Sequence, residues 1–420
     1  MTSRSYPEPN PQHTPTSSTK GASRVDVAVV GAGIIGLGIA WSLVRSGRSV
    51  CVIDPDPAMG ATRAAAGMLA PVSEYHHQEE ELLGLTLRSA LLYPEFVRTL
   101  ADGGRETGYL TTETLLVGID AGDRQALRDL YDKQLSQGLP ILPMTIRELR
   151  TQEPLLSPRL SAGYRAADDR QVDPRILSAS LLDALADPDA HSGKTSFERR
   201  PAKGLLHERA DDSSSRVVGI QFDDGDTLTA DEVIVANGTA AGDLHGLPRG
   251  LSMPLRPVFG DIIRITVPGT LRPLLHATIR AAVHGNSVYI VPRSDGTAVV
   301  GATQRETGTA GVSSRGIFEL LRDAQDVVPA VAEADIAEIM ARARPATPDN
   351  KPLLGRVRHP DGSNIAGLII ATGFFRHGVL LTPVAAEICQ RLVEGPDDTQ
   401  WAPFRPDRFR LTSTSPKEHQ

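Results

Sequence analysis

The hydrophobic positions near the start of the chain alternate between strand-like runs and a helix-like stripe. An apolar, β-rich run at 25–30 is followed by the turn GAGIIG, an apolar periodic stretch at 35–44 and a second apolar run at 49–54. Short β-branched runs favour strands, whereas apolar residues that recur every third or fourth position favour a helix. This order predicts a βαβ unit.

Further elements follow the same rules. Leucine spacing predicts helices over about 79–100 and 124–137, and Asp173 with Pro174 suits the first turn of a helix to about 185. An amphipathic stretch near the C-terminus predicts a last helix that ends near residue 393. The predicted strands are 217–222, 233–236, 262–267, 288–291 and 368–371. The region is interrupted by a segment at 268–273 that begins and ends with proline, and the strands at 262–267 and 288–291 are expected to belong to a second sheet.

Length and charge narrow the class of protein. A chain of 420 residues exceeds the usual limit of a single core, about 250–300 residues, so two domains are expected. The net charge is −7 and no basic block stands out, which argues against nucleic acid and anionic membranes as partners. Residues 1–22 are expected to form a disordered tail, and 406–420 a frayed one. Without a secretory apolar segment or a long apolar run, a cytoplasmic protein is expected.

The two cysteines, Cys51 and Cys389, both lie among apolar residues. Two such residues cannot build a disulfide framework or a cysteine metal site, so both are interpreted as core residues. No metal is expected.

The turn GAGIIG follows a predicted strand and opens a predicted helix, which is the context of a dinucleotide-binding site. Gly31 permits the tight turn, Gly33 lets the backbone approach a pyrophosphate, and Gly36 lets helix and strand pack closely. Asp54, at the end of the second predicted strand, is suited to accept hydrogen bonds from the ribose hydroxyls of the dinucleotide. A glycine turn without a ligand is the alternative, and the turn alone does not decide between FAD and NAD.

Two longer motifs carry a resemblance to a known family. ATRAAAGMLAP at 61–71 and ATGFFRHGVLLTP at 371–383, with GAGIIG and the GAT of 301–303, resemble the D-amino-acid oxidase superfamily of flavoproteins, most closely its glycine oxidases. The likeness runs from about residue 24 to 395. It implies an α/β fold in which a Rossmann-like FAD-binding domain carries an inserted antiparallel-sheet substrate domain. The expected ranges are 24–90, 160–250 and 340–398 for the FAD-binding domain, and 91–159 and 251–339 for the substrate domain.

The resemblance also implies a non-covalently bound FAD, since Cys389 falls in an apolar helix pattern and cannot serve as a flavin attachment site. Small residues at 61–71 suit a flat ring system, although a helix-packing segment is the alternative. The resemblance also implies that residues 374–380 start a helix whose N-terminus faces the flavin pyrimidine ring. The chain departs from the family at Phe374, where His is frequent, and at His377, where Asn is frequent. The implied cofactor-binding residues are Gly31, Gly33, Ile34, Ile35, Gly36, Asp54, Pro55, Thr62, Arg63, Ala66, Gly67, Met68, Ala202, Gly373, Phe374, Phe375, Arg376, His377, Gly378, Val379 and Leu380.

The substrate residues implied by the resemblance are Arg344, Arg376 and Tyr289. An arginine fork suits a substrate carboxylate. The alternatives are surface charges on a helix end for Arg342 and Arg344, and a core aromatic for Tyr289. His76 and His77 are interpreted as solvated, and Gln304 as a residue that lines the pocket.

The resemblance implies oxidation of glycine, with sarcosine or small D-amino acids as further substrates, and O2 as electron acceptor. The imine product is then expected to supply the thiazole synthase of thiamine biosynthesis. Two alternatives remain open: a dehydrogenase of the same fold acting on D-amino acids, sarcosine or proline, and a catalytically silent FAD-binding protein. A homo-oligomer is also left open.

Overall fold

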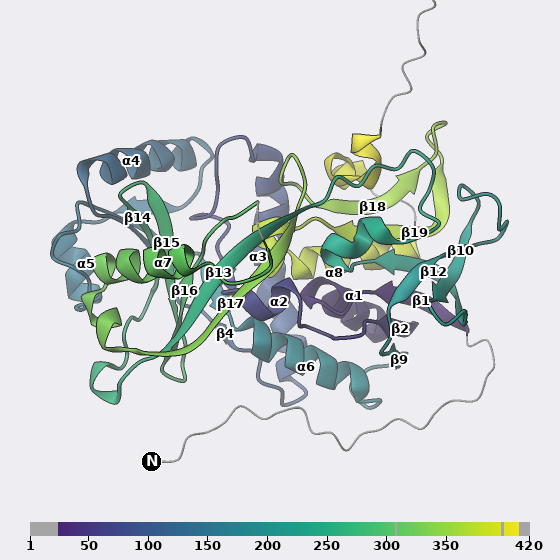
Figure 1. Cartoon of the computed structure of the whole chain (residues 1–420), viewed down its shortest axis with the longest axis horizontal. Coiled ribbons are helices and arrows are strands. Elements are labelled where there is room, and N and C mark those ends of the chain that lie inside the picture. The colour runs from purple at the N-terminus through teal and green to yellow at the C-terminus, as the bar shows by residue number, and fades with distance from the viewer. Residues whose placement is uncertain (1–23, 307–308, 396–398, 411–420) are drawn as a thin grey trace, which may run out of the picture.

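The structure is a computed structural model that describes residues 24–306, 309–395 and 399–410. Two large sheets lie side by side with helices around them (Figure 1). The helices are α1 (Ile34–Arg45), α2 (Ala61–Ala64), α3 (Glu80–Ala101), α4 (Ala121–Ser136), α5 (Ile146–Gln152), α6 (Pro174–Ala186), α7 (Ser314–Val327) and α8 (Thr382–Glu394). Among the described residues, no helix combines the length and apolar character needed to cross a membrane.

The first sheet contains the predicted βαβ unit. Its strands are β1 (Arg24–Val30), β2 (Ser49–Ile53), β9 (Lys194–Glu198), β10 (Ala202–His207), β11 (Val217–Phe222), β12 (Thr227–Val235), β18 (Leu353–Arg358) and β19 (Asn364–Thr372). β1 pairs in parallel with β2 and β12, and β19 pairs in parallel with β12. Parallel neighbours need crossover connections, and α1 supplies the one between β1 and β2. The apolar face of α1 packs against α6 and α8, so the glycine turn before α1 is held by a buried core.

The second sheet has the strand order β17-β13-β16-β15-β14-β5-β7-β6. Its strands are β5 (Thr114–Gly118), β6 (Ile141–Pro143), β7 (Ala162–Ala166), β13 (Arg256–Thr266), β14 (Thr278–Val283), β15 (Asn286–Pro292), β16 (Thr297–Gly301) and β17 (Asp335–Ala346). All neighbours are antiparallel except β5 and β14. The strands predicted at 262–267 and 288–291 therefore lie in a sheet separate from the βαβ unit, as expected. A small third sheet, β3 (Met68–Leu69), β8 (Arg170–Val172) and β4 (Tyr109–Leu110), lies between the large ones.

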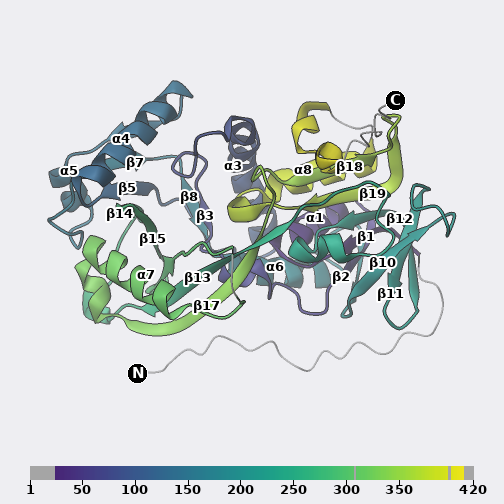
Figure 2. The same cartoon turned by 45° about the horizontal axis from the view of Figure 1, so that its top comes forward.

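β13 and β17 are the two longest strands of the second sheet, and they pair along their full length. Figure 1 and Figure 2 show both strands running from the second sheet toward the helices of the first. Side chains on these strands can therefore face a space between the two sheets.

The sheet pairings refine the expected domain limits. β7 at Ala162–Ala166 and the end of β17 after residue 340 both belong to the second sheet, while α3 packs against α8 beside the first. The chain crosses between the sheets after α3, after β7, between β12 and β13, and after β17, beside the approximate limits expected near residues 90, 160, 250 and 340. The domain ranges themselves stay a prediction.

Two local expectations differ from the structure. The helix expected to begin near Phe374 begins at Thr382, because Gly373 and Phe375 have positive φ angles of 75° and 48° and only a short 3-10 turn, Phe375–His377, precedes α8. The tail expected to fray from residue 406 is packed as far as Arg410, since Arg408 pairs with Asp349. The expected tail at 1–22 and residues 411–420 lie outside the described residues.

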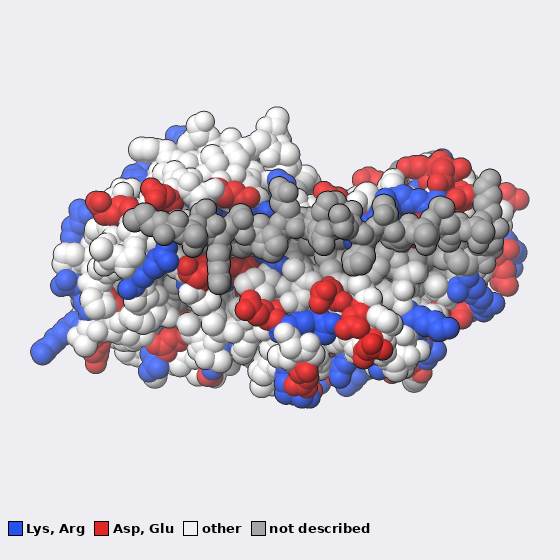
Figure 3. Space-filling view, turned by 90° about the horizontal axis from the view of Figure 1, so that it is seen from below, with Lys and Arg blue, Asp and Glu red and all other residues white. Residues whose placement is uncertain are grey.

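The two cysteines are buried, as predicted. Cys51 lies in β2 and Cys389 in α8, with 1% and 0% of their surface exposed. On the face in Figure 3, acidic and basic side chains are interspersed rather than gathered into one broad field.

Candidate functional site

A cavity of about 1300 Å³ lies between the two sheets. Its walls come from the glycine turn and α2 on one side and from β13, β15 and β17 on the other. We call the part beside the glycine turn the dinucleotide half, and the part beside Tyr289 and Arg344 the substrate half.

The glycine turn has the geometry that the sequence predicted. Gly31 has a φ angle of 104°, and an added Cβ there would lie 2.6 Å from the carbonyl of Ala236. A Cβ on Gly36 would lie 1.9 Å from the Gly31 oxygen, so α1 and the turn touch at backbone distance. By contrast, a Cβ on Gly33 would have no atom nearer than 3.5 Å, because Gly33 faces the cavity. The N-cap residue of α1 is Gly33, which has no side chain to cap the helix, and a helix N-terminus that opens onto a cavity favours an anionic group.

Two side chains complete this wall. The Thr62 hydroxyl accepts the Ile34 N–H at 2.9 Å, which joins α2 to the start of α1. The Asp54 carboxylate accepts the N–H groups of Ala32 at 2.7 Å and Asp56 at 2.8 Å. Each carboxylate oxygen retains a lone pair, so Asp54 can still accept from hydroxyls that enter the cavity.

The segment after α2 is held by arginines that sequence reasoning missed. Arg175 on α6 donates to the Arg63 carbonyl at 3.1 Å, and Arg293 donates to the Ala66 carbonyl. These bonds fix the small residues of 64–68 against the cavity. No local pattern identifies the two arginines, because their partners lie 112 and 227 positions away in the sequence.

Most of the implied cofactor residues line the cavity. They are Gly31, Gly33, Ile34, Ile35, Asp54, Thr62, Ala66, Gly67, Met68, Phe374, Phe375, Arg376, Gly378 and Val379. The remaining ones lie behind the wall or apart from it: Gly36, Pro55, Arg63, Ala202, Gly373, His377 and Leu380. For all of these residues, contact with the cofactor stays a prediction. Ala202 in particular lies at the start of β10 on the outer edge of the first sheet.

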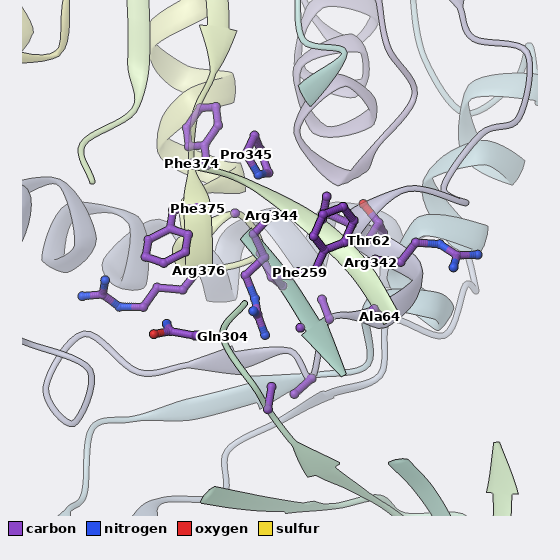
Figure 4. A pocket seen from close by; sticks show the side chains of 18 of the residues that line it. Thr62, Ala64, Phe259, Gln304, Arg342, Arg344, Pro345, Phe374, Phe375 and Arg376 are labelled. Carbon is purple, nitrogen blue, oxygen red and sulfur yellow. The ribbon is translucent and has the colours of Figure 1, made fainter. Parts of the chain in front are cut away.

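The substrate half is built around Arg344 on β17. Figure 4 shows its side chain projecting into the cavity between Gln304 and Phe259, so neither Arg344 nor Arg342 lies on a helix end. The guanidinium donates to the Thr303 carbonyl at 3.3 Å, and within the described chain no carboxylate pairs with it. Gly260 on β13 leaves room for the Arg344 guanidinium, because a Cβ at residue 260 would lie 2.3 Å from Nη1 of Arg344.

Tyr289 on β15 lies beside Arg344. Its ring crosses Gly301 on the neighbouring strand, where an added Cβ would lie 2.4 Å from the hydroxyl. The pKa of Tyr289 is raised above its ordinary value by burial, and the nearby charge of Arg344 offsets only part of this increase. The hydroxyl therefore stays protonated near neutral pH and can donate a hydrogen bond.

Two ion pairs that sequence reasoning missed close this end of the cavity. Arg280, directly opposite Tyr289 on β14, pairs with Glu74, and Arg376 pairs with Glu79. All four side chains are at most 15% exposed. Arg376, which the sequence assigned to the substrate, therefore reaches a carboxylate of the protein in this structure.

Two histidines of this region, His76 and His377, are neutral near pH 7. His76 and His77 are exposed to the cavity and line it. Burial by the surrounding walls, with Arg376 and Arg280 nearby, lowers the pKa of His76 to about 4. Burial, with Arg376 and His76 nearby, also lowers the pKa of His377 well below its ordinary value. Its Nδ1 lies 3.6 Å from Glu74.

A glycine-turn βαβ unit that shares a cavity with an antiparallel sheet defines a dinucleotide-binding enzyme of the two-domain oxidoreductase type. The chain belongs to the DAO family of FAD-dependent oxidoreductases, whose model matches residues 26–392. The dinucleotide half fits FAD, because it offers a helix N-terminus that opens onto the cavity, an acceptor carboxylate and a wall of small residues.

Known proteins of this family include glycine oxidases. The chain is 31% identical over 374 residues to the glycine oxidase of Geobacillus kaustophilus, covering 88% of this chain and 93% of that one. The crystal structure of glycine oxidase from the same organism superposes with a TM-score of 0.80, at 29% identity, over 92% of this chain and 99% of that chain. The "Bifunctional protein ThiO/ThiG" of Trichormus variabilis is 32% identical over 398 residues, which cover 93% of this chain. This chain spans about half of that relative's length, 56%.

Proposed function

We propose that this protein is an FAD-dependent oxidase of a small amino acid, with glycine as the preferred substrate. One observation carries the proposal: Arg344 presents a guanidinium to the middle of the cavity without a carboxylate partner in the described chain. Three other arginines around it, Arg280, Arg305 and Arg376, pair with carboxylates, whereas Arg342 on the same strand donates to backbone carbonyls. An amino acid carboxylate supplies the missing partner and can bind the fork in bidentate fashion.

The substrate half also supplies the other contacts that a small amino acid needs. The protonated Tyr289 hydroxyl donates a second hydrogen bond to the carboxylate held by Arg344. Phe375 and Phe259 line the cavity nearby and exclude water from the Cα position. Neutral His76 and His377 place no extra positive charge beside the amine, so the free base form of the amine is tolerated.

Bound FAD supplies the two-electron oxidation, and the protein orients the substrate against it. The Cα hydrogen leaves glycine as a hydride, and the amine loses a proton as the C=N bond forms. In total, glycine, O2 and water give glyoxylate, ammonia and hydrogen peroxide. Because relatives combine ThiO with ThiG in one protein, we propose that the imine can instead pass to a thiazole synthase in thiamine biosynthesis.

The test is anaerobic titration of the FAD-loaded protein with glycine, sarcosine, D-alanine and D-proline. We expect glycine to bleach the flavin absorbance band most efficiently, and peroxide to form when air is admitted. Bleaching without peroxide would show a dehydrogenase instead. A flavin that none of the four amino acids bleaches would contradict the proposed function.

A further inference from the structure

The charge of the substrate half is set by the ion pairs Glu74–Arg280 and Glu79–Arg376. Three guanidiniums, those of Arg280, Arg344 and Arg376, lie around the Tyr289 end of the cavity. Glu74 and Glu79 each neutralise one of them, and of these three Arg344 alone has no carboxylate partner in the described chain. One of the three positive charges at this end of the cavity is therefore uncompensated.

The two carboxylates are built into the protein and cannot easily turn away from the cavity. Glu74 is 7% exposed and lies between Arg280 and Nδ1 of His377, which is 3.6 Å away. Glu79 is also 7% exposed, and Figure 4 shows its partner Arg376 reaching away from Arg344. A buried carboxylate that lost its arginine would be left desolvated and unpaired, which is strongly unfavourable.

We infer that Glu74 is a specificity-determining residue that restricts the site to substrates with one carboxylate. This inference rests on the proposed function. A substrate with a second carboxylate would bring that group toward Arg280, which Glu74 already neutralises. The two carboxylates would then repel each other in a partly desolvated space, which weakens binding of a dicarboxylate.

Removing the Glu74 charge should therefore widen the choice of ligand. In Glu74→Gln, Arg280 keeps its charge and becomes a second anchor, so amino acids such as iminodiacetate or D-aspartate gain a partner. Sarcosine and D-alanine are the matched substrates, because each lacks only the second carboxylate.

The experiment uses FAD-loaded protein and two non-reacting ligands, acetate and malonate, whose binding is followed by the change in the flavin spectrum. In the wild-type protein we expect acetate to bind more tightly than malonate. In Glu74→Gln the ratio of malonate to acetate affinity should rise by about tenfold or more. The same change in ratio is expected for turnover of iminodiacetate relative to sarcosine.

Three variants serve as controls. Glu306→Gln removes an equal charge from the rim of the same cavity, where Glu306 pairs with Arg256 and is 61% exposed, and should leave the ratio unchanged. The double variant Glu74→Gln/Arg280→Gln lacks the new anchor and should return to the wild-type preference. If Glu74→Gln does not fold, Glu79→Gln tests the same charge balance by releasing Arg376.

The outcomes separate the inference from the proposed function. If acetate perturbs the flavin and glycine is oxidised, but releasing Arg280 or Arg376 leaves the malonate to acetate ratio unchanged, the inference is wrong and the proposed function stands. If neither monocarboxylate binding nor glycine oxidation occurs in the wild-type protein, both are wrong.

Discussion

The dinucleotide half and the substrate half of the cavity are built in different ways. The first is formed mainly by backbone: a turn, a helix N-terminus and a segment of small residues, most of them close together in the sequence. The second is formed by charged and hydroxyl side chains from segments far apart, such as Glu74 and Arg280, which are 206 positions apart. The shape of the dinucleotide half therefore depends on residues that lack large side chains. The properties of the substrate half depend on which charged side chains are present.

The largest effect is expected from removing the charge at the centre of the substrate half. Arg344→Ala should weaken binding of glycine or acetate by about 2–5 kcal/mol, because the carboxylate then enters the cavity without a cation. Titration of the FAD-loaded variant measures this loss. Arg342→Ala is the matched control, since Arg342 lies two residues away on β17 and donates to the Met59 carbonyl. Equal losses in the two variants would remove the special role of Arg344.

The next effect tests the dinucleotide half by adding one methyl group. Gly36→Ala places a Cβ 1.9 Å from the Gly31 carbonyl oxygen, so α1 must move away from the turn. We expect a loss of about 1–3 kcal/mol in the free energy of unfolding, together with weaker FAD binding. Thermal unfolding and flavin content after purification measure both. Gly84→Ala on α3 is the control, because its Cβ would meet no atom within 4 Å. Normal FAD content in Gly36→Ala would refute the close packing.

A smaller effect is expected where the substrate half also depends on a missing atom. Gly260→Ala places a Cβ 2.3 Å from Arg344 Nη1, and the flexible guanidinium must shift. Because small displacements of an anchoring group weaken transition-state contacts, we expect kcat/KM for glycine to fall by about tenfold while FAD binding is retained. Gly269→Ala, whose Cβ would meet no atom within 4 Å, should leave kcat/KM unchanged. Loss of FAD from Gly260→Ala would mean that the two halves are not separable.

The smallest effect concerns pH. The pKa of His76 is lowered to about 4, so its imidazole is neutral at pH 6 and becomes charged as the pH falls toward 4. The added positive charge attracts an anionic ligand, so the affinity for anions should rise by about a few fold as His76 becomes protonated. Titration with trifluoroacetate, which stays ionised over this range, measures the change. His76→Gln should abolish the increase, and an unchanged increase would assign it to another group.

The sequence predicted the two halves unequally, for a physical reason. The βαβ unit and its glycines follow from contiguous residues, since local periodicity and backbone sterics decide them, and the structure matches them within a few residues. Arg344 and Tyr289 were identified only through the family motifs. Glu74, Glu79 and Arg280 were missed because the role of a charged side chain depends on its ion-pair partner. These partners are far apart in the sequence and meet only in the folded protein. The helix expected at Phe374 failed because Phe375 adopts a positive φ, which its residue type does not indicate.

The buried cysteines have a consequence for an oxidase of the proposed kind, which releases hydrogen peroxide within its own cavity. Peroxide attacks thiolates far more readily than protonated thiols, and oxidation beyond the sulfenic acid is largely irreversible. Burial raises the pKa of Cys51 to about 11 and that of Cys389 to about 12. Since the chain has only these two cysteines, both buried and protonated, it offers its own product no thiolate and should resist self-inflicted oxidative inactivation at sulfur through many turnovers.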